Sequence, residues 1–167
     1  MAETLDSSQY LTFRLGEEVY AMSVASIREI LEVPRITRVP RMPPYLEGII
    51  NLRGNVIPVL DLALKFGIGE TPITKDTSII VAEISGVFRE DPAETVVVGV
   101  YSDMVLKVVE IPPEAIEPPP VIGTSIDTSF IRGMGKIDDE FVIVLRLDSV
   151  LSEDDWSAED RQGGQGT

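Results

Sequence analysis

The side chains that could carry catalysis in this sequence are carboxylates, lysines, tyrosines and hydroxyls, because it contains no histidine and no cysteine. The missing imidazole removes the commonest general base and the commonest transition-metal ligand. The missing thiol removes thiolate chemistry and disulfides. Asp138–Glu140 has the composition of a cation site, but no further oxygen ligands are spaced around it, which favours a solvated turn. Ser125, Ser129 and Ser149 have no base close to them in the sequence.

Nucleotide and metal motifs are equally scarce. The sequence contains no Walker loop, Rossmann fingerprint, calcium loop or zinc spacing, and Gly133-Met134-Gly135 lacks a third glycine and a following helix. A hydrolase that uses a pair of carboxylates stays open as the enzymatic alternative, although the acids lie mainly in turns and in the last residues. We therefore expect no catalytic residue, no metal and no cofactor, and we favour a role in protein binding.

The charge and the apolar runs limit the other function classes. Fourteen Lys and Arg stand against 28 Asp and Glu, a net charge of −14, and such a surface repels nucleic-acid phosphates. Apolar runs are too short to span or insert into a membrane. Met1–Gln9 is polar and acidic, unlike a signal peptide, so we expect a cytoplasmic protein. Residues 152–167 hold five acids, one arginine and a Gly/Gln-rich end, which predicts an acidic, disordered tail.

The elements that must position any site are predicted to be short strands separated by Gly, Pro, Asn and Asp, as in a small barrel or sandwich. Asp61–Phe66 followed by Gly67, and Asp148–Glu153, predict two short helical turns. Ser85–Thr95 is predicted to be a long hairpin connection. The predicted strands are Tyr10–Leu15, Val19–Ser23, Ile27–Val33, Gly48–Leu52, Asn55–Leu60, Thr77–Ile84, Thr95–Tyr101, Met104–Ile111 and Glu140–Leu147.

The chain also repeats itself weakly. Glu32-Val33-Pro34 recurs as Glu110-Ile111-Pro112, and Tyr45-Leu46-Glu47-Gly48 matches Phe130-Ile131-Arg132-Gly133 at a slightly larger offset. This order predicts two similar half-barrels, each too small to bury an adequate core alone. Chance similarity between short β segments is the alternative.

Two segments are candidates for binding. Arg53 and Gly54 lie in a tight turn between two apolar strands, where Gly54 suits positive φ and Asn55 tolerates it. Arg53 is either a solvated turn residue or a partner anchor, and Glu29 is a candidate to hold its guanidinium. Val24, Ile27 and Ile30 recur every third residue, as in a 3₁₀-like turn. If the chain is extended from Ile27 onward, then Ile27, Glu29 and Leu31 share one face, and Arg28, Ile30 and Glu32 share the other. The apolar residues either join the core or line an exposed groove.

These segments resemble the CheW family. The resemblance covers about Tyr10 to Leu151 and is strongest around the tight turn. The matching residues are Tyr10-Leu11-Thr12-Phe13, Leu15–Ala21, Val24, Ile27, Glu29-Ile30, Ile36–Pro40, Pro44–Gly48, Asn51-Leu52-Arg53-Gly54, Ile57-Pro58-Val59, Asp61-Leu62 and Val100–Val105.

The resemblance implies an all-β fold of two intertwined, SH3-like, five-stranded barrels that share a core, with short helical turns. It places a CheW-like domain at residues 1–151, in halves of roughly 10–75 and 76–151 that exchange strands, before the tail at 152–167. It implies a non-enzymatic chemotaxis adaptor that binds the regulatory domain of a CheA-type histidine kinase and the cytoplasmic tip of methyl-accepting chemoreceptors, and that is recruited from the cytoplasm to receptor arrays. The receptor-binding positions carried over are Leu11, Val24, Ile27, Glu29, Ile30, Arg53 and Val105, and the kinase-binding position is Gly48.

The same barrel pair occurs in the kinase's own regulatory domain and in CheV. Those chains carry kinase modules or a receiver domain, so we expect a stand-alone adaptor here. A structural or inhibitory β domain with one partner is the remaining alternative.

Overall fold

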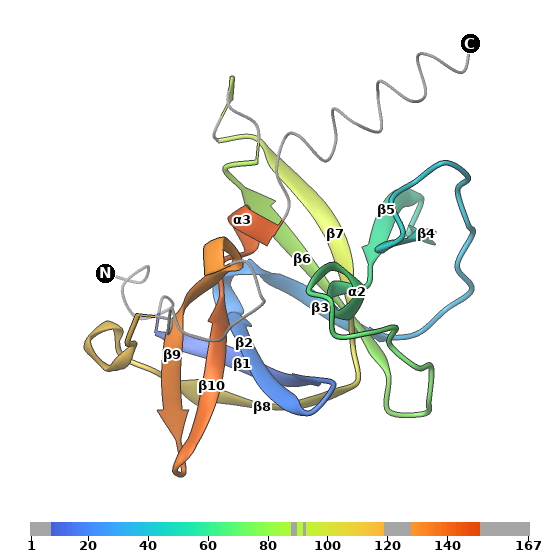
Figure 1. Cartoon of the computed structure of the whole chain (residues 1–167). Coiled ribbons are helices and arrows are strands. Elements are labelled where there is room, and N and C mark those ends of the chain that lie inside the picture. The colour runs from blue at the N-terminus through green and yellow to red at the C-terminus, as the bar shows by residue number, and fades with distance from the viewer. Residues whose placement is uncertain (1–7, 88–89, 92, 119–127, 151–167) are drawn as a thin grey trace.

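The fold is that of an all-β protein, as its computed structural model shows (Figure 1). The structure describes residues 8–87, 90–91, 93–118 and 128–150. The strands in this part are β1 (Gln9–Leu15), β2 (Glu18–Ser23), β3 (Ile27–Glu32), β4 (Leu46–Leu52), β5 (Asn55–Leu60), β6 (Ser78–Ser85), β7 (Thr95–Ser102), β8 (Met104–Glu110), β9 (Ile131–Ile137) and β10 (Glu140–Leu145). The helices are α2 (Leu62–Lys65) and α3 (Leu147–Val150), with 3₁₀ turns η1 (Val24–Ser26), η2 (Pro113–Ala115) and η3 (Thr128–Phe130).

The strands form two five-stranded sheets of the same design. One has the order β8-β1-β2-β10-β9 and the other β3-β6-β7-β5-β4. In each sheet the central connection is parallel, β2 with β10 and β5 with β7, and the remaining pairs are antiparallel. Each sheet therefore combines strands from the early and late parts of the chain. This exchange, together with the SH3-like barrels and short helical turns, confirms the predicted fold class.

The two sheet orders are related by the internal repeat. Exchanging β1 with β6, β2 with β7, β3 with β8, β4 with β9 and β5 with β10 converts one order into the other. Helix α2 begins at Leu62, and α3 begins at Leu147, the position that the repeat makes equivalent. The repeat seen in the sequence therefore corresponds to matching strands and helices. The division of the domain at residue 76 stays a prediction.

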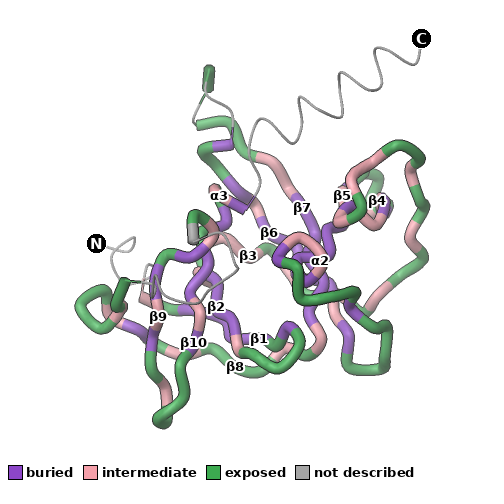
Figure 2. The backbone as a smooth tube through the Cα atoms, in the orientation of Figure 1, coloured by how far each residue is buried: buried purple, intermediate pink, exposed green. Residues whose placement is uncertain are grey.

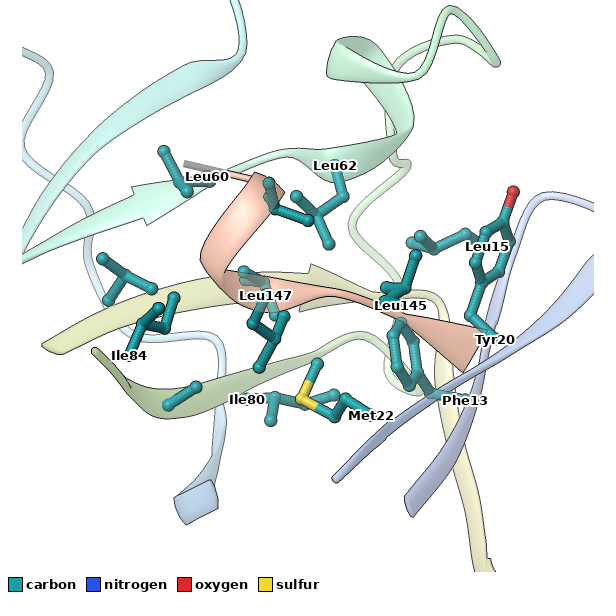
Figure 3. Close-up of a cluster of buried hydrophobic side chains, with 14 of the residues drawn as sticks. Phe13, Leu15, Tyr20, Met22, Leu60, Leu62, Ile80, Ile84, Leu145 and Leu147 are labelled. Atoms are coloured by element: carbon teal, nitrogen blue, oxygen red, sulfur yellow. The ribbon is translucent and has the colours of Figure 1, made fainter. Parts of the chain in front are cut away.

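The core consists of three apolar clusters. The largest lies between the sheets and includes Phe13, Tyr20, Leu60, Ile80 and Leu145 (Figure 3). A second cluster fills the barrel of β3–β7, and a third fills the barrel of β1, β2 and β8–β10. Figure 2 shows the buried residues concentrated where the sheets meet. Because the largest cluster takes residues from both sheets, neither barrel buries its apolar surface alone.

A lysine also joins the two repeats. Lys65, at the end of α2, places its Nζ atom 4.0 Å from the ring centre of Tyr45 and 5.6 Å from that of Phe130. These rings precede β4 and β9 at equivalent positions of the repeat. The ammonium group is therefore in cation–π contact with both halves.

Two elements of the structure differ from the prediction. Strand β9 was not predicted, because Gly133 and Gly135 interrupt its β pattern. Gly133 is needed there, since a Cβ would lie 2.4 Å from Ile116 Cγ2 and 2.5 Å from the carbonyl oxygen of Glu117. Strand β10 ends at Leu145, because Leu147 already starts α3 one residue before the predicted helix. Helix α2 is confirmed, capped by Asp61 and followed by Gly67 at φ 79°.

The predicted tail, residues 152–167, lies outside the described residues. Val150, the last described residue, is only 1% exposed and belongs to the cluster between the sheets. We expect deletion of Ser152–Thr167 to leave kinase binding nearly intact and to change the melting temperature by no more than a few degrees. Thermal unfolding followed by circular dichroism measures this. A large fall in melting temperature would mean that Trp156 packs on the barrels.

Candidate protein-binding site

The turn between β4 and β5 presents Arg53 to solvent. Arg53 has φ 53° and Gly54 has φ 85°, the pair of left-handed residues typical of a type I′ hairpin turn. The Gly54 amide donates to Asn51 Oδ1 at 3.0 Å, which fixes the turn. Asn55 is the first residue of β5 and lies outside the left-handed pair. The prediction of positive φ was therefore correct for Gly54, but it missed Arg53.

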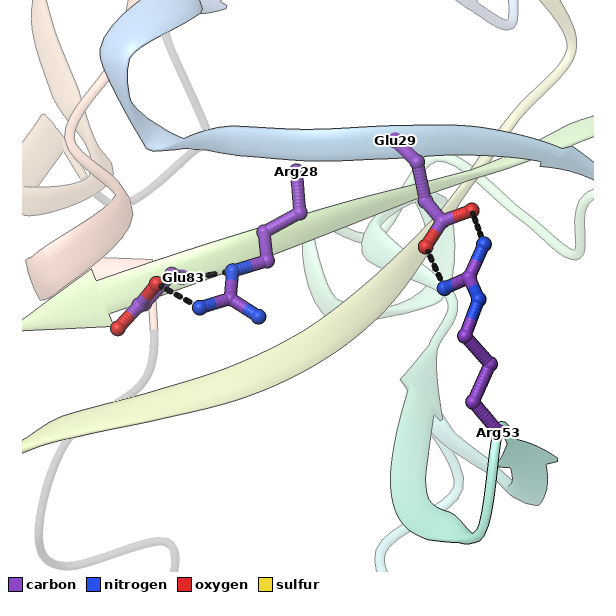
Figure 4. Close-up of polar contacts among 4 residues, drawn as sticks. All are labelled: Arg28, Glu29, Arg53 and Glu83. Atoms are coloured by element: carbon purple, nitrogen blue, oxygen red, sulfur yellow. Dashed lines mark hydrogen bonds and ion pairs between the residues drawn. The ribbon is translucent and has the colours of Figure 1, made fainter.

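Glu29, on β3, forms an ion pair with the guanidinium of Arg53 in the β4–β5 turn. Arg53 Nη1 donates to Glu29 Oε2 at 2.5 Å, and Nη2 donates to Oε1 at 3.0 Å (Figure 4). This hydrogen bonding lowers the pKa of the Glu29 carboxyl and raises the pKa of the Arg53 guanidinium. The predicted contact is therefore present. The Arg53 side chain stays 70% exposed, so the pair adds little stability and leaves the cation available to a partner.

A second ion pair lies beside the first. Arg28 donates from Nε to Glu83 Oε1 at 2.9 Å (Figure 4). The Thr95 hydroxyl donates to Glu83 Oε2 at 2.8 Å. The hydrogen bond from Thr95 is the main cause that lowers the pKa of the Glu83 carboxyl. Adjacent residues of β3 thus pair with different neighbours, Glu29 with the β4–β5 turn and Arg28 with β6.

These ion pairs surround a hollow of about 410 Å³. Arg28, Glu29 and Arg53 supply its charged rim, and its apolar lining includes Leu52, Ile57, Val81 and Val97. The hollow has no arrangement of catalytic groups. Its chemistry suits contact with a side chain that is partly apolar and partly charged.

A β-bulge at Arg28 changes which residues of β3 share a face. Ile27 pairs with Ala82 and Ile30 pairs with Ile80, whereas Glu29 pairs with Val81. Paired residues lie on the same face of a sheet, so Ile27 and Ile30 lie together and Glu29 lies opposite. The predicted face shared by Ile27, Glu29 and Leu31 was therefore wrong for Ile27, because a regular alternation does not allow for the extra residue. Glu29 and Leu31, which pair with Val81 and Ile79, do share a face. The predicted 3₁₀ turn is present at Val24–Ser26.

Strand β8 repeats this arrangement at the edge of the other sheet. A bulge in the β1–β8 pairing brings Val105 opposite Phe13 and Val108 opposite Leu11. Val105 and Val108 thus share a face, and the internal repeat makes them the equivalents of Ile27 and Ile30. We call Ile27, Ile30, Val105 and Val108 the edge patch.

The edge patch combines support from the core with exposed apolar surface. Ile27 and Val105 pack against the cluster between the sheets, while Ile30 is 43% exposed and Val108 is 55% exposed. The prediction from sequence missed Val108, although the repeat that relates Glu32 to Glu110 was available to find it.

The other predicted binding residues differ in accessibility. Val24 is half-buried against the same cluster. Leu11 is only 5% exposed, and its cross-strand neighbour Val108 offers the open surface at that point. Gly48 is buried as well, because residues 36 and 37 lie directly over it. A Cβ at Gly48 would lie 2.3 Å from the carbonyl oxygen of Thr37.

Two barrels with an apolar edge patch and an exposed, ion-paired arginine define a protein-binding domain of the SH3-like class. Among the residues that the structure describes, no three His, Cys, Asp or Glu side chains are grouped to hold a metal ion. Within that same part of the chain, every helix is too short or too polar to cross a membrane.

Comparison with known proteins identifies the family. The family model of the CheW-like domain matches residues 9–155. The chain is 31% identical to a probable chemotaxis protein CheW of Rhizobium etli over 150 residues, 90% of this chain and 91% of that protein. It is 34% identical to the chemotaxis protein CheW of Helicobacter pylori over 146 residues, 87% of this chain and 82% of that protein. The crystal structure of the scaffolding protein TtCheW from Thermoanaerobacter tengcongensis matches with a TM-score of 0.75 and 38% identity, covering 86% of this chain and 87% of that one.

The chain therefore belongs to the CheW family and is a chemotaxis signal-transduction adaptor.

Proposed function

We propose that this adaptor couples the cytoplasmic tips of methyl-accepting chemoreceptors to the regulatory domain of a CheA-type histidine kinase, as a scaffold and without turnover. The observation that carries the proposal is the edge patch, where two repeat-related strands expose apolar side chains supported by a rigid core. Exposed apolar surface of this kind is typical of a site for an amphipathic helix.

The receptor helix is proposed to lie on the edge patch. Ile27, Ile30 and Val105, with Val108 added, give the apolar contact, and Val24 borders it. Leu11 supports the patch from the core. Glu29 and Arg53 supply a charged contact beside it, because the carboxylate orients the guanidinium while leaving most of it exposed. Arginine held in this way is favoured at interface hot spots.

Gly48, the position predicted to contact the kinase, is buried, so its effect on kinase binding would have to be indirect. Because Gly48 is buried under residues 36 and 37, we propose that it positions the segment above it, and that this segment and the adjoining edge of β4 meet the kinase. A larger residue at 48 would displace that segment.

The absence of histidine and cysteine from the sequence favours a scaffold over an enzyme. We propose that the protein works in the cytoplasm at membrane-associated receptor arrays. Its proposed organisation is a domain at residues 1–151, with halves of roughly 10–75 and 76–151, followed by the acidic segment 152–167.

We expect Arg53→Ala to weaken receptor binding selectively. Removing an exposed arginine changes the free energy of unfolding by no more than about 0.5 kcal/mol, whereas loss of an interface anchor costs about 2 kcal/mol of binding. Glu29→Ala should weaken the same contact by less, because the guanidinium stays but loses its fixed orientation. Titration of a soluble receptor-tip fragment measures both effects.

The kinase regulatory domain is the control ligand in this experiment. Equal loss of both partners would indicate unfolding of the variant. Unchanged receptor affinity would mean that Arg53 is only a solvated turn residue.

A further inference from the structure

The ion pair between Glu29 and Arg53 has a counterpart on the second barrel. Lys107, on β8, places its Nζ atom 3.7 Å from Oδ2 of Asp138 in the β9–β10 turn. The internal repeat makes Lys107 the equivalent of Glu29 and Asp138 the equivalent of Arg53, at the two offsets already seen in the repeat. Both barrels therefore have an ion pair at the same place, with the signs of the two charges exchanged.

The backbone of the two turns is also the same. Arg53 has φ 53° and Asp138 has φ 51°, and the residues that follow them, Gly54 and Asp139, have φ 85° and 67°. Both hairpins thus use the pair of left-handed residues typical of a type I′ turn. The side chains of Arg53 and Asp138 are 70% and 84% exposed, so a partner can reach both.

The residues around these two side chains increase the contrast in charge. We call residues 51–55 the basic turn and residues 136–140 the acidic turn. The basic turn holds Arg53 as its one charged residue, a formal charge of +1. The acidic turn holds one lysine and three acids, a formal charge of −2. All of these charged side chains are exposed.

Each ion pair borders one half of the edge patch. Glu29 directly precedes Ile30 on β3, and Lys107 directly precedes Val108 on β8. Ile30 and Val108 are the most exposed members of the patch. The Thr12 hydroxyl donates to the carbonyl oxygen of Lys107 at 2.7 Å and accepts from its amide at 3.1 Å, which holds β8 in place at its bulge. The apolar surface is therefore bordered by an exposed cation in one half and an exposed anion in the other.

The edge patch by itself does not distinguish the two directions in which a helix can lie on it. The exchange of strands that converts one sheet into the other also exchanges Ile27 with Val105 and Ile30 with Val108. Because applying this exchange twice restores each half, the relation is an approximate two-fold rotation. Such a rotation reverses a helix that lies across its axis and leaves that helix on equivalent apolar side chains.

The two turns break this symmetry. In Figure 1 the β4–β5 hairpin lies on the right and the β9–β10 hairpin lies on the left, so the turns face opposite ends of such a helix. In one direction an acidic end of the helix meets the basic turn, and a basic end meets the acidic turn. In the other direction both contacts bring like charges together.

The charges are strong enough to select a direction without contributing much affinity. An exposed charge contact changes affinity by only about 1.4- to 5-fold. The choice of direction combines four contacts, two attractive in one direction and two repulsive in the other. If each contributes about twofold, one direction is preferred by about 16-fold.

We propose that the two turns set the direction in which a partner helix binds the edge patch, with its acidic end at Arg53 and its basic end at Asp138. The partner is an amphipathic helix that carries an acid and a base at opposite ends of its apolar face. This inference rests on the proposed function, because it takes the receptor helix as the occupant of the patch. It adds Lys107 and Asp138 to the binding surface, and it assigns orientation to the charges and affinity to the apolar contact.

Energy transfer between fluorescent labels tests the direction. The sequence contains no cysteine, so one introduced cysteine takes one label. Val56→Cys and Phe141→Cys are suitable, because the repeat makes these positions equivalent and they are 64% and 58% exposed beside the two turns. A receptor-tip fragment carries the second label at the acidic end of its contact helix. We expect strong transfer from position 56 and weak transfer from position 141.

A variant with the two ion pairs exchanged provides the comparison. Equivalent residues are exchanged between the two barrels, so the turns take charges of −2 and +1 while the net charge stays −14. Strong transfer should then move to position 141. The six changes are Glu29→Lys, Arg53→Asp, Asn55→Glu, Lys107→Glu, Asp138→Arg and Glu140→Asn.

Salt tests the same point without changing the turns. Raising the salt from about 0.1 M to about 1 M shortens the screening length from about 10 Å to about 3 Å. The difference in transfer between positions 56 and 141 should shrink as the charges are screened. A difference that is unchanged at high salt contradicts a charge-based choice of direction.

The outcomes separate this inference from the proposed function. Circular dichroism verifies that the exchanged variant is folded. Equal transfer from both positions in the wild type, or strong transfer that stays at position 56 in the folded exchanged variant, overturns the inference and leaves receptor binding in place. A wild-type chain that does not bind the receptor-tip fragment overturns the proposed function and this inference with it.

Discussion

Replacing Gly48 with alanine is expected to destabilise the protein by about 2–6 kcal/mol, the largest effect of any single change considered. A Cβ at this position would lie 2.3 Å from the Thr37 carbonyl oxygen and 2.8 Å from Ile36 Cγ2. Overpacking of this kind costs about 1–3 kcal/mol. The backbone φ of 156° is also one that side chains rarely adopt, and such strain costs about 1–3 kcal/mol. Urea unfolding followed by circular dichroism gives the free energy of unfolding directly.

Gly54→Ala is the matched control. Gly54 also has positive φ, at 85°, but a Cβ there would meet no atom within 4 Å. It should cost only about 1–2 kcal/mol, the conformational cost of a left-handed residue. If both variants lost the same free energy of unfolding, the close packing of Gly48 against Ile36 and Thr37 would contribute nothing to the cost of the Gly48 change.

Gly48→Asp is expected to weaken kinase association, because the family resemblance places Gly48 at the kinase contact. This change carries the same packing penalty and adds a buried charge. Because this change also destabilises the fold, kinase binding has to be measured on the folded fraction of the variant. Normal kinase binding by a folded Gly48→Asp protein would remove Gly48 from the kinase site.

Placing two carboxylates in the edge patch is expected to reduce receptor-tip affinity at least about 30-fold, equivalent to about 2 kcal/mol. The change is Ile30→Glu together with Val108→Glu. Both side chains are already exposed, at 43% and 55%, so stability should change little. An apolar helix face docked on them, however, would have to bury unpaired charges. Isothermal titration with a receptor-tip fragment measures the loss.

Ile73→Glu serves as the comparison variant, because Ile73 is 57% exposed outside the edge patch. It should bind the receptor fragment as the wild type does. If Ile73→Glu and the double variant lose affinity equally, the effect comes from net charge and the edge patch is not the receptor site.

The sequence allowed most strands to be predicted, because alternating or β-branched apolar residues reflect burial against a neighbouring layer. Tight-turn residues likewise located Arg53 and Gly54. Strand β9 was missed because its glycines are required by Ile111, Ile116 and Glu117, which lie far away in the sequence. Close approach between distant segments leaves no local pattern.

The sequence indicated which residues lie in the candidate site, but it did not indicate which way their side chains point. The sequence analysis predicted that Glu29 holds the guanidinium of Arg53, and in the structure Arg53 Nη1 lies 2.5 Å from Glu29 Oε2. The side on which Ile27 and Ile30 lie depends on the bulge at Arg28, which is set by the pairing with β6. The burial of Leu11 and Gly48 likewise depends on what packs over them, and their positions in a family pattern do not reveal it.

The central claim is that one chain holds receptor and kinase together, and a bridging assay tests it most directly. Receptor-tip fragment is immobilised, and the regulatory domain of a CheA-type kinase is passed over it with and without this protein. We predict that retention of the kinase domain rises with the amount of adaptor added and falls when Ile30→Glu, Val108→Glu protein replaces the wild type. Retention that is the same with and without the adaptor would contradict the account.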